Sequence, residues 1–246
     1  MEAARDDSRF RCGEVACDLH KMVKSLNGTV LDIRSSNEST IHPANALLTR
    51  ALQLCSEDST GLVHPVLSIG DHATDPYHQM LQCWASKLEE DAETVFRGEK
   101  GRKYIFLLNN ISHVLGLMRR PEATLASREL MGRLVSLIQP YRKSYLAESW
   151  LPLNNTLHSK LDEFTAGFVA TCDYQRTWKV RAELRYGLQE EIVDLIVPPY
   201  QAALQLQANP SRLSVSGVLR VMAGKKKQKK YTAEDLKKEI RSLFEG

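Results

Sequence analysis

YIFLLNNISHVLGLM, residues 104–118, decides the fold class, because it is apolar on nearly every side when it is wound as a helix. A helix that is apolar all round belongs in the interior of a protein. Its two asparagines, Asn109 and Asn110, would then need hydrogen-bond partners inside the protein. The stretch therefore predicts a buried helix whose two asparagines form hydrogen bonds with other parts of the protein.

Helical spacing of apolar residues continues toward the N-terminus. A helix is predicted from Pro76, ending by Gly98, and another covers residues 9–26. A further helix starts after His42-Pro43, where proline is tolerated in the first turn. Its predicted inward-facing residues are Ala46, Leu47, Ala51 and Leu54.

The C-terminal half has the same character. Residues 125–150 predict one or two helices with a break at Pro140, and residues 174–206 predict a long helix with a kink or junction at Pro198-Pro199. A stripe at helical spacing consists of Leu157, Leu161, Phe164, Phe168 and Cys172. No strand-like alternation competes with these patterns, so the chain is predicted to be all-α.

The last segment predicts a short capped helix. Thr232 and Asp235 have the spacing of a capping box at its start. Its apolar face, expected to pack on the preceding helices, consists of Leu236, Ile240, Leu243 and Phe244. Its outer face is predicted to present Lys237, Lys238 and Arg241 to solvent.

Composition narrows the class of protein further. The 246 residues are 43% hydrophobic and 26% charged, which excludes a disordered polyampholyte. Five scattered cysteines without a CxxC pair are typical of a reducing compartment. The chain shows neither a run long enough to span a membrane nor an apolar leader at its start, so a cytoplasmic protein is expected.

Catalytic and metal-binding signatures are missing. GxxxxGK[ST], GxGxxG, GxSxG and HExxH do not occur. One group of residues that could in principle ligate zinc consists of His64, His72, His78 and Cys83, but it matches no structural zinc spacing. The adjacent carboxylates Glu89-Glu90-Asp91 and Glu190-Glu191 point in different directions on a helix and are expected to form ordinary solvated faces. We therefore expect no enzyme, no metal and no cofactor.

Positive charge is concentrated at the C-terminal end. Residues 211–246 hold ten Lys and Arg against four Asp and Glu, whereas the rest of the chain holds 23 basic and 26 acidic residues. The centre of the excess is Lys225, Lys226, Lys227, Lys229 and Lys230, here called the lysine block. Such a block is a solvated loop, a nucleic-acid contact or a site for anionic lipid. Nucleic acid is disfavoured because Tyr231 is the only adjacent aromatic residue.

Seven sequence blocks are informative: Ile41-His42-Pro43, residues 104–110 (YIFLLNN), residues 175–178 (QRTW), residues 181–185 (RAELR), Pro198-Pro199-Tyr200, residues 229–236 (KKYTAEDL) and residues 243–246 (LFEG). In this order they resemble blocks of the seventy-kilodalton exocyst subunit family, above all of its plant-type members. The chain is much shorter than family members, so it resembles their C-terminal portion, as an N-terminally truncated member.

The resemblance implies an elongated rod of stacked antiparallel helical bundles. It also implies a non-enzymatic role in exocytosis, tethering secretory vesicles to the plasma membrane as a cytoplasmic, peripheral membrane protein. The family binds phosphatidylinositol 4,5-bisphosphate through a basic C-terminal surface, and its lipid-contacting lysines match Lys227 and Lys230. Each Lys or Arg near an anionic leaflet contributes about 1 kcal/mol to membrane binding. The predicted lipid-binding residues are Lys225, Lys226, Lys227, Lys229, Lys230, Lys237, Lys238 and Arg241.

The helix predictions and the family resemblance together give the expected segments of the chain and its expected partners. Residues 1–40 are expected to form an N-terminal helix and polar loop, residues 41–210 the helical-bundle rod, and residues 211–246 the basic loop and terminal helix. Expected partners are a phosphoinositide membrane and other exocyst subunits, with no nucleic acid. The alternative is a diverged adaptor or decoy outside the exocyst, for instance in plant immunity, which keeps its helical surface for other proteins.

Overall fold

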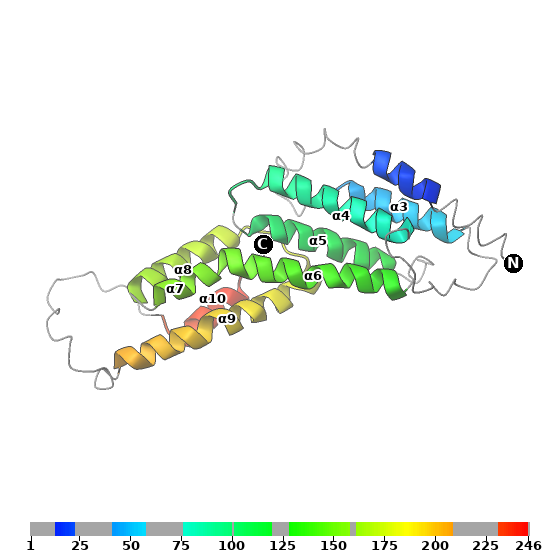
Figure 1. Ribbon diagram of the computed structural model, residues 1–246. Helices are drawn as coiled ribbons and strands as arrows, with labels where there is room; N and C mark the ends of the chain where they lie inside the picture. The colour runs from blue at the N-terminus through cyan, green and yellow to red at the C-terminus, as the bar shows by residue number, and fades with distance from the viewer. Residues whose placement is uncertain are drawn as a thin grey trace. The chain divides into compact units, whose positions relative to one another are not determined.

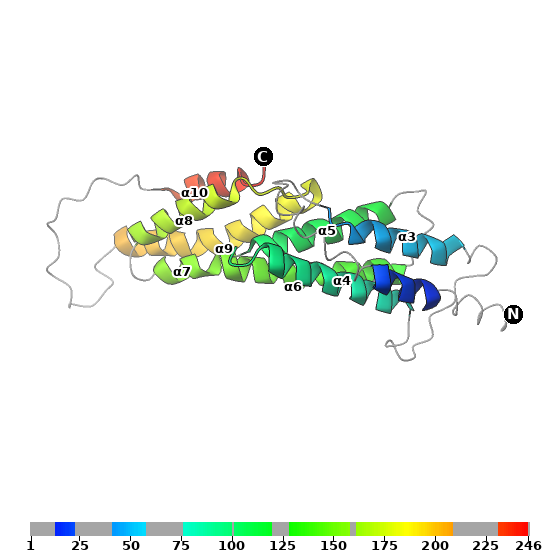
Figure 2. The same cartoon turned by 90° about the horizontal axis from the view of Figure 1, so that it is seen from above.

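The computed structural model describes residues 13–22, 41–57, 76–99, 101–119, 128–157, 161–208 and 231–245. Every regular element within these ranges is a helix, as Figures 1 and 2 show. The all-α prediction is therefore confirmed. The chain divides into two compact units, residues 1–142 and 143–246. Both domain boundaries expected from the sequence, after residues 40 and 210, lie outside the described ranges.

The first unit is built around a buried helix. It contains the helical residues 13–22, α3 (Ala44–Glu57), α4 (Pro76–Val95), α5 (Arg102–Met118) and the first part of α6 (Arg128–Ser149). Helices α3, α4 and α5 contact one another in all three pairings, side by side in Figure 1. Residues 105–112 of α5 are buried without interruption. The burial expected from the apolar sequence of this helix is confirmed.

Asn110 satisfies its hydrogen-bonding groups through residues far away in the sequence. Its Oδ1 accepts from the backbone N–H of His42 at 2.7 Å and from Nδ2 of Asn45 at 2.8 Å. Its own Nδ2 donates to the carbonyl of Phe106 at 2.8 Å. Trp84 completes the cluster by donating Nε1–H to Asn45 Oδ1 at 2.9 Å. Asn110 thus has the polar partners that its burial requires. These hydrogen bonds also hold the start of α3 against α4 and α5.

His42 belongs to a second buried polar group next to this cluster. Its Nδ1 accepts from the backbone N–H of Ala44 at 3.0 Å, so that nitrogen carries no proton. Its Nε2–H donates to Asp91 Oδ2 at 2.8 Å, and the Lys87 ammonium contacts Asp91 Oδ1 at 2.9 Å. All three side chains are at most 5% exposed. Burial lowers the pKa of His42, which agrees with the neutral form that the hydrogen bonds require.

This arrangement predicts a loss of stability in mild acid. The unfolded chain binds a proton at His42 below about pH 6.5, whereas the folded chain, with its lowered pKa, resists protonation. Stability contributed by neutral His42 is therefore present above about pH 6.5 and declines as pH falls toward the folded-state pKa. Thermal unfolding between about pH 7 and pH 5 should show a smaller decline for His42→Gln, in which the side-chain amide can donate to Asp91 but does not titrate. Equal slopes for the two proteins would contradict the assignment.

The second unit packs aromatic side chains between its helices. It contains the end of α6, α7 (Leu151–Leu157), α8 (Leu161–Gln175), α9 (Ala182–Ala208) and α10 (Ala233–Arg241). The predicted stripe from Leu157 to Cys172 is buried along its whole length, although Leu157 ends α7 and the other members lie on α8. Phe164 stacks against both Phe168 and Tyr200.

A buried hydrogen-bond chain ties α6 and α8 together inside the second unit. The Tyr145 hydroxyl donates to Gln175 Oε1 at 2.5 Å and accepts from Trp150 Nε1 at 2.9 Å. All three side chains are almost fully buried. Burial is the main reason that the pKa of Tyr145 is raised, so its hydroxyl keeps the proton that it donates.

Three local predictions are corrected by the structure. Helix α6 runs through Pro140 without the expected break, and α9 runs through Pro198-Pro199 without a junction. The exposed position of Pro140 and of Ser136, four residues earlier, lets water satisfy the carbonyl that proline leaves unbonded. The chain between α8 and α9, residues 176–181, is not helical as predicted.

The register of α3 also differs from the prediction. Ala46 is exposed and Leu47 is only partly buried, while Ala51 is buried as expected; the Leu54 side chain lies outside the described part. The residues that face the core are Ala44, Asn45, Leu48, Ala51 and Leu52. The inward face includes a polar residue, Asn45, and it was therefore not visible as an apolar stripe.

Candidate functional site

Helix α10 starts with the predicted capping box and packs on the second unit. The backbone N–H of Asp235 donates to Thr232 Oγ1 at 3.1 Å, and the N–H of Thr232 donates to Asp235 Oδ2 at 2.8 Å. The predicted apolar face is at most 1% exposed and comprises Leu236, Ile240, Leu243 and Phe244. Both predictions for this helix are confirmed, and its main contact is with α9.

The two ends of α10 are each held by a side chain of α9. Before the helix, the Tyr200 hydroxyl donates to the carbonyl of Tyr231 at 2.7 Å. After the helix, Gln189 Nε2 donates to the carbonyls of Arg241 and Leu243 at 2.9 and 2.8 Å. The C-terminal carbonyls of a helix lack intrahelical partners, so this amide satisfies groups that would otherwise be unpaired.

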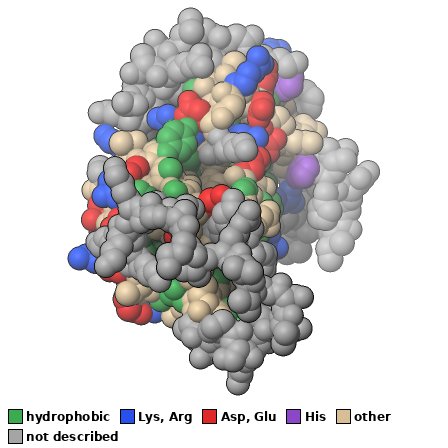
Figure 3. Space-filling view, turned by 90° about the vertical axis from the view of Figure 1, so that its left-hand side faces the viewer, with side chains coloured by type: hydrophobic (Ala, Val, Ile, Leu, Met, Phe, Trp, Pro, Cys, Tyr) green, Lys and Arg blue, Asp and Glu red, His purple; other side chains and the backbone are tan. Residues whose placement is uncertain are grey.

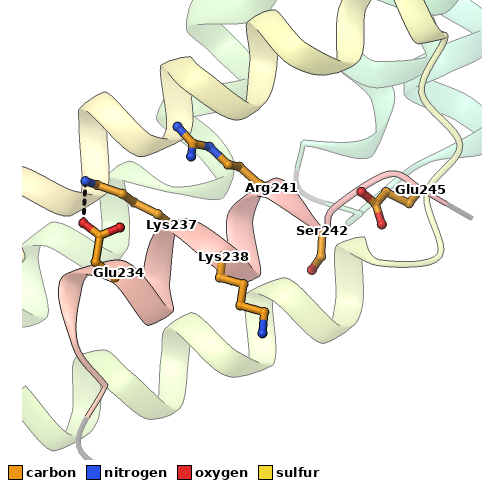
Figure 4. Close-up of a pocket in the computed structure, with 6 residues that line it drawn as sticks. All are labelled: Glu234, Lys237, Lys238, Arg241, Ser242 and Glu245. Carbon is orange, nitrogen blue, oxygen red and sulfur yellow. Dashed lines mark hydrogen bonds and ion pairs between the residues drawn. The ribbon is translucent and has the colours of Figure 1, made fainter.

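The three predicted cations of α10 have different surroundings. Lys237 and Arg241 lie on one side of the helix, while Lys238 extends from the other side (Figure 4). The Lys237 ammonium contacts Glu234 at 2.8 Å, and the Arg241 guanidinium contacts Glu190 of α9 at 3.1 Å. Lys238 is exposed and makes no ion pair among the described residues. Of the three, it is the one whose charge is not already matched by a carboxylate.

These cations line a shallow, open depression of about 390 Å³ together with Glu234, Ser242 and Glu245. Residues 231–245 hold three basic and four acidic residues, so this segment alone is not positively charged. On the face seen in Figure 3, the described Lys and Arg side chains likewise lie among Asp and Glu. A strongly positive surface here depends on the lysine block.

All five residues of the lysine block lie outside the described part of the chain. Their assignment as lipid-binding residues remains a prediction. What the structure adds is the position of Tyr231, the residue that follows the block in the sequence. Tyr231 is held through its carbonyl by Tyr200, and its ring lies edge-on to Phe168 with the ring centroids 6.3 Å apart. Tyr231 therefore has a fixed position on the second unit.

Glu190 and Gln189 are the residues of this site that sequence reasoning missed. Both lie on α9, more than 50 residues before the groups that they contact on α10. Glu190 was seen only as a member of an ordinary solvated carboxylate pair. A charge pairing between two helices cannot be read from spacing within either one.

No described helix is long and apolar enough to cross a membrane. No group of three His, Cys, Asp or Glu side chains in the described ranges could hold a metal ion. Of the four candidate zinc ligands, His64 and His72 lie outside those ranges, and His78 Nδ1 lies 3.0 Å from Arg133 Nη1. Comparison with known proteins decides the family.

Residues 72–242 match the family model described as the C-terminal part of the Exo70 exocyst complex subunit. The chain belongs to the Exo70 family. A curated relative is exocyst complex component EXO70A1 of Arabidopsis thaliana, 23% identical in an alignment that covers 85% of this chain and 36% of the relative. The chain thus spans about a third of that Exo70 protein. The family resemblance inferred from the sequence blocks is confirmed.

The Exo70 fold is shared with solved structures. The yeast exocyst component Exo70p, from S. cerevisiae, superimposes with a TM-score of 0.66 at 16% identity, over 96% of this chain and 51% of that one. Another S. cerevisiae Exo70 structure gives a TM-score of 0.59 at 16% identity, over 99% of this chain and 60% of that one. These structures establish an Exo70-type helical-bundle fold for the chain.

Buried contacts give a reason for three of the sequence blocks. The block at Ile41-His42-Pro43 and the block at residues 104–110 meet in the first unit, where the His42 N–H donates to Asn110. Gln175, from the QRTW block, accepts from Tyr145 in the second unit. The blocks that carry the Exo70 resemblance therefore include buried polar contacts between helices.

Proposed function

We propose that this chain acts in exocytosis as an exocyst-subunit-like protein that tethers secretory vesicles to the plasma membrane. The contact is made by its basic C-terminal region with phosphatidylinositol 4,5-bisphosphate. Membership of the Exo70 exocyst subunit family supports the exocyst-related part of this role. In this role the chain is a cytoplasmic protein that binds the membrane peripherally. Its partners are other exocyst subunits, and the role involves no catalysis.

The observation that carries the lipid proposal is the fixed position of Tyr231, the residue that follows the lysine block in the sequence. Tyr200 and Phe168 hold Tyr231 on the second unit, just before the amphipathic helix α10. A cluster of four to eight Lys or Arg on an amphipathic helix is a recognised cue for anionic phosphoinositides, and the lysine block closely precedes α10 in the sequence. Lys238, exposed on α10, adds a further cation near this point.

The ion pairs of α10 indicate which of the predicted lipid-binding residues contribute most to membrane attraction. Lys237 and Arg241 already contact Glu234 and Glu190, so they contribute less net positive charge than an unpaired cation. The lysine block carries five positive charges and no carboxylate. We therefore expect the block to dominate membrane attraction and Lys238 to add a smaller amount.

Co-sedimentation with liposomes containing phosphatidylinositol 4,5-bisphosphate tests this proposal. The native chain should bind at low salt and lose affinity as salt rises, because surface charges are screened. Replacing Lys225, Lys226, Lys227, Lys229 and Lys230 with alanine should abolish binding. Lys238→Ala should weaken it by at most about fivefold, which corresponds to about 1 kcal/mol for one charge at the membrane surface.

A charge-matched control removes five exposed cations elsewhere. The control positions are Lys21, Arg50, Arg97, Arg119 and Lys143. This variant should retain most of its liposome binding. If both variants lost binding equally, the loss would depend on the total charge of the chain and not on the lysine block. In the same assay, Glu234→Gln should increase binding by releasing Lys237, whereas Asp194→Asn on α9, with the same change in charge, should increase it less. Absence of native binding would remove the tethering proposal.

Exocyst membership has its own test, which separates the proposal from the adaptor alternative. Affinity purification of the tagged chain should recover other exocyst subunits. Recovery of an unrelated partner set that survives replacement of the lysine block would instead favour an adaptor. Retention on RNA or DNA with a steep salt dependence would favour nucleic-acid binding.

A further inference from the structure

Cys83 on α4 lies against a histidine from the N-terminal helix of the first unit. Its sulfur is 3.2 Å from Nδ1 of His20, 63 residues earlier in the sequence. Cys83 is a partly buried cysteine, not part of a disulfide, that packs against the core, and His20 is exposed. Ala16 and Leu19 are buried on the same helix and hold it in place. The pair therefore joins a nucleophile to a potential base at the protein surface.

The distance between the two atoms has a chemical meaning. A nucleophile and a base within hydrogen-bond reach of each other are the minimum arrangement for an activated side chain. Nδ1 of a neutral imidazole can accept the thiol proton, and the imidazolium that results stabilises the thiolate. The thiolate is the form of cysteine that attacks disulfides and other electrophiles.

We propose that Cys83 is a modification site that undergoes thiol–disulfide exchange with a small-molecule disulfide, with the His20 imidazole as its proton acceptor. This inference does not depend on the proposed membrane function.

The exchange balances without any further reactant. His20 takes the thiol proton, and the Cys83 sulfur attacks one sulfur of the small disulfide. The old S–S bond breaks as the new bond between Cys83 and the small molecule forms. The departing thiolate takes the proton from His20 and leaves as a free thiol. Cys83 is oxidised to a mixed disulfide, and the departing sulfur is reduced.

Two other cysteines provide internal references. Cys172 on α8 is buried, and burial raises the pKa of its thiol to about 12, so it should be unreactive near neutral pH. Cys17 is exposed on the same helix as His20, three positions earlier. Exposure alone therefore predicts that Cys17 reacts first, whereas activation by His20 predicts that Cys83 reacts at least as fast despite its partial burial.

Modification at Cys83 has a structural consequence. A glutathione-sized group on a sulfur that lies under His20 cannot fit without moving that side chain. The helix that carries His20 contributes Leu19 and Ala16 to the core of the first unit. The mixed disulfide should therefore loosen this helix from α4, which gives the modification a conformational readout besides its mass.

The test incubates the full chain with oxidised glutathione near neutral pH and follows each cysteine-containing peptide by mass spectrometry. Cys83 should form a mixed disulfide, and His20→Ala should slow its formation by about threefold to tenfold. The gain from more thiolate is partly offset because a less basic thiolate is a weaker nucleophile. Lys21→Ala, an exposed change next to His20, should leave the Cys83 rate unchanged. Circular dichroism would establish that the variants keep their helical content.

The pH dependence of the Cys83 rate separates activation from simple accessibility. The Cys83 rate should rise at lower pH in the native chain than in His20→Ala, whose rate should follow the ordinary range of thiols. Hydrogen exchange should show loss of protection in residues 13–22 after modification. A Cys83 rate as low as that of Cys172, or an unchanged rate in His20→Ala, would overturn the proposal.

Discussion

Replacing Asp91 with alanine is expected to destabilise the first unit by about 3–5 kcal/mol, the usual cost of removing one partner of a buried ion pair. The Asp91 carboxylate contacts Lys87 at 2.9 Å and His42 at 2.8 Å, and its side chain is 3% exposed. Without it, the Lys87 ammonium loses its short contact, and the His42 Nε2–H is left without this acceptor. Urea unfolding followed by circular dichroism would measure the loss.

Two companion variants make the result specific. Glu90→Ala removes the neighbouring carboxylate, which is 71% exposed and 4.0 Å from Lys87, and should change stability by no more than about 0.5 kcal/mol. Adding Lys87→Met to Asp91→Ala should recover part of the loss, because it removes a buried charge that has lost its short ion pair. Hydrogen exchange should place the change in α3, α4 and α5. A cost below about 1 kcal/mol for Asp91→Ala would show that the pair is not effectively buried.

Replacing Phe244 with alanine should cost about 3–5 kcal/mol in the second unit, as for other fully buried aromatic side chains. Phe244 is 0% exposed and lies shortly after Arg241, the last residue of α10. The expected result is increased hydrogen exchange in α10 and in the part of α9 that it covers. Because Gln189 bonds the carbonyl of the preceding Leu243, the loss should also weaken the hold on the end of α10.

Glycine at the same position separates packing from backbone strain. Phe244 has a φ of 65°, in the left-handed region that costs a non-glycine residue about 1 kcal/mol or more. Phe244→Gly should therefore be no less stable than Phe244→Ala, although it removes one more carbon atom. Glu245→Ala, at the exposed next position, should have little effect. If alanine were clearly more stable than glycine, the backbone conformation would not be strained in the way the angle implies.

Helix positions could be predicted from the sequence where apolar spacing and capping signals agreed. The burial of residues 105–112, the stripe ending at Cys172 and the capping box at Thr232 were all visible as local patterns. The break expected at Pro140 and the junction allowed for at Pro198-Pro199 are absent, because a local preference was overridden. On both sides of Pro198-Pro199, buried residues such as Ile196 and Tyr200 keep α9 packed in one piece.

Contacts between distant residues could not be predicted in the same way. The sequence showed that Asn110 would need partners, but not that His42 and Asn45 supply the donors. It showed that α10 carries three cations, but not that Glu190 of α9 pairs with Arg241. Such pairings depend on which helices are neighbours, and helical periodicity says only which face is inward.

The burial of Leu243 and Phe244 has a practical consequence for the design of fusion proteins. Glu245 is exposed, so the chain leaves the core directly after Phe244. A fluorescent protein joined there without a spacer would begin beside a buried aromatic ring and the carbonyl held by Gln189. A flexible glycine–serine spacer would let the fused domain move without pulling on these contacts. Reporter fusions meant to follow this protein in cells are therefore best built with such a spacer at this end.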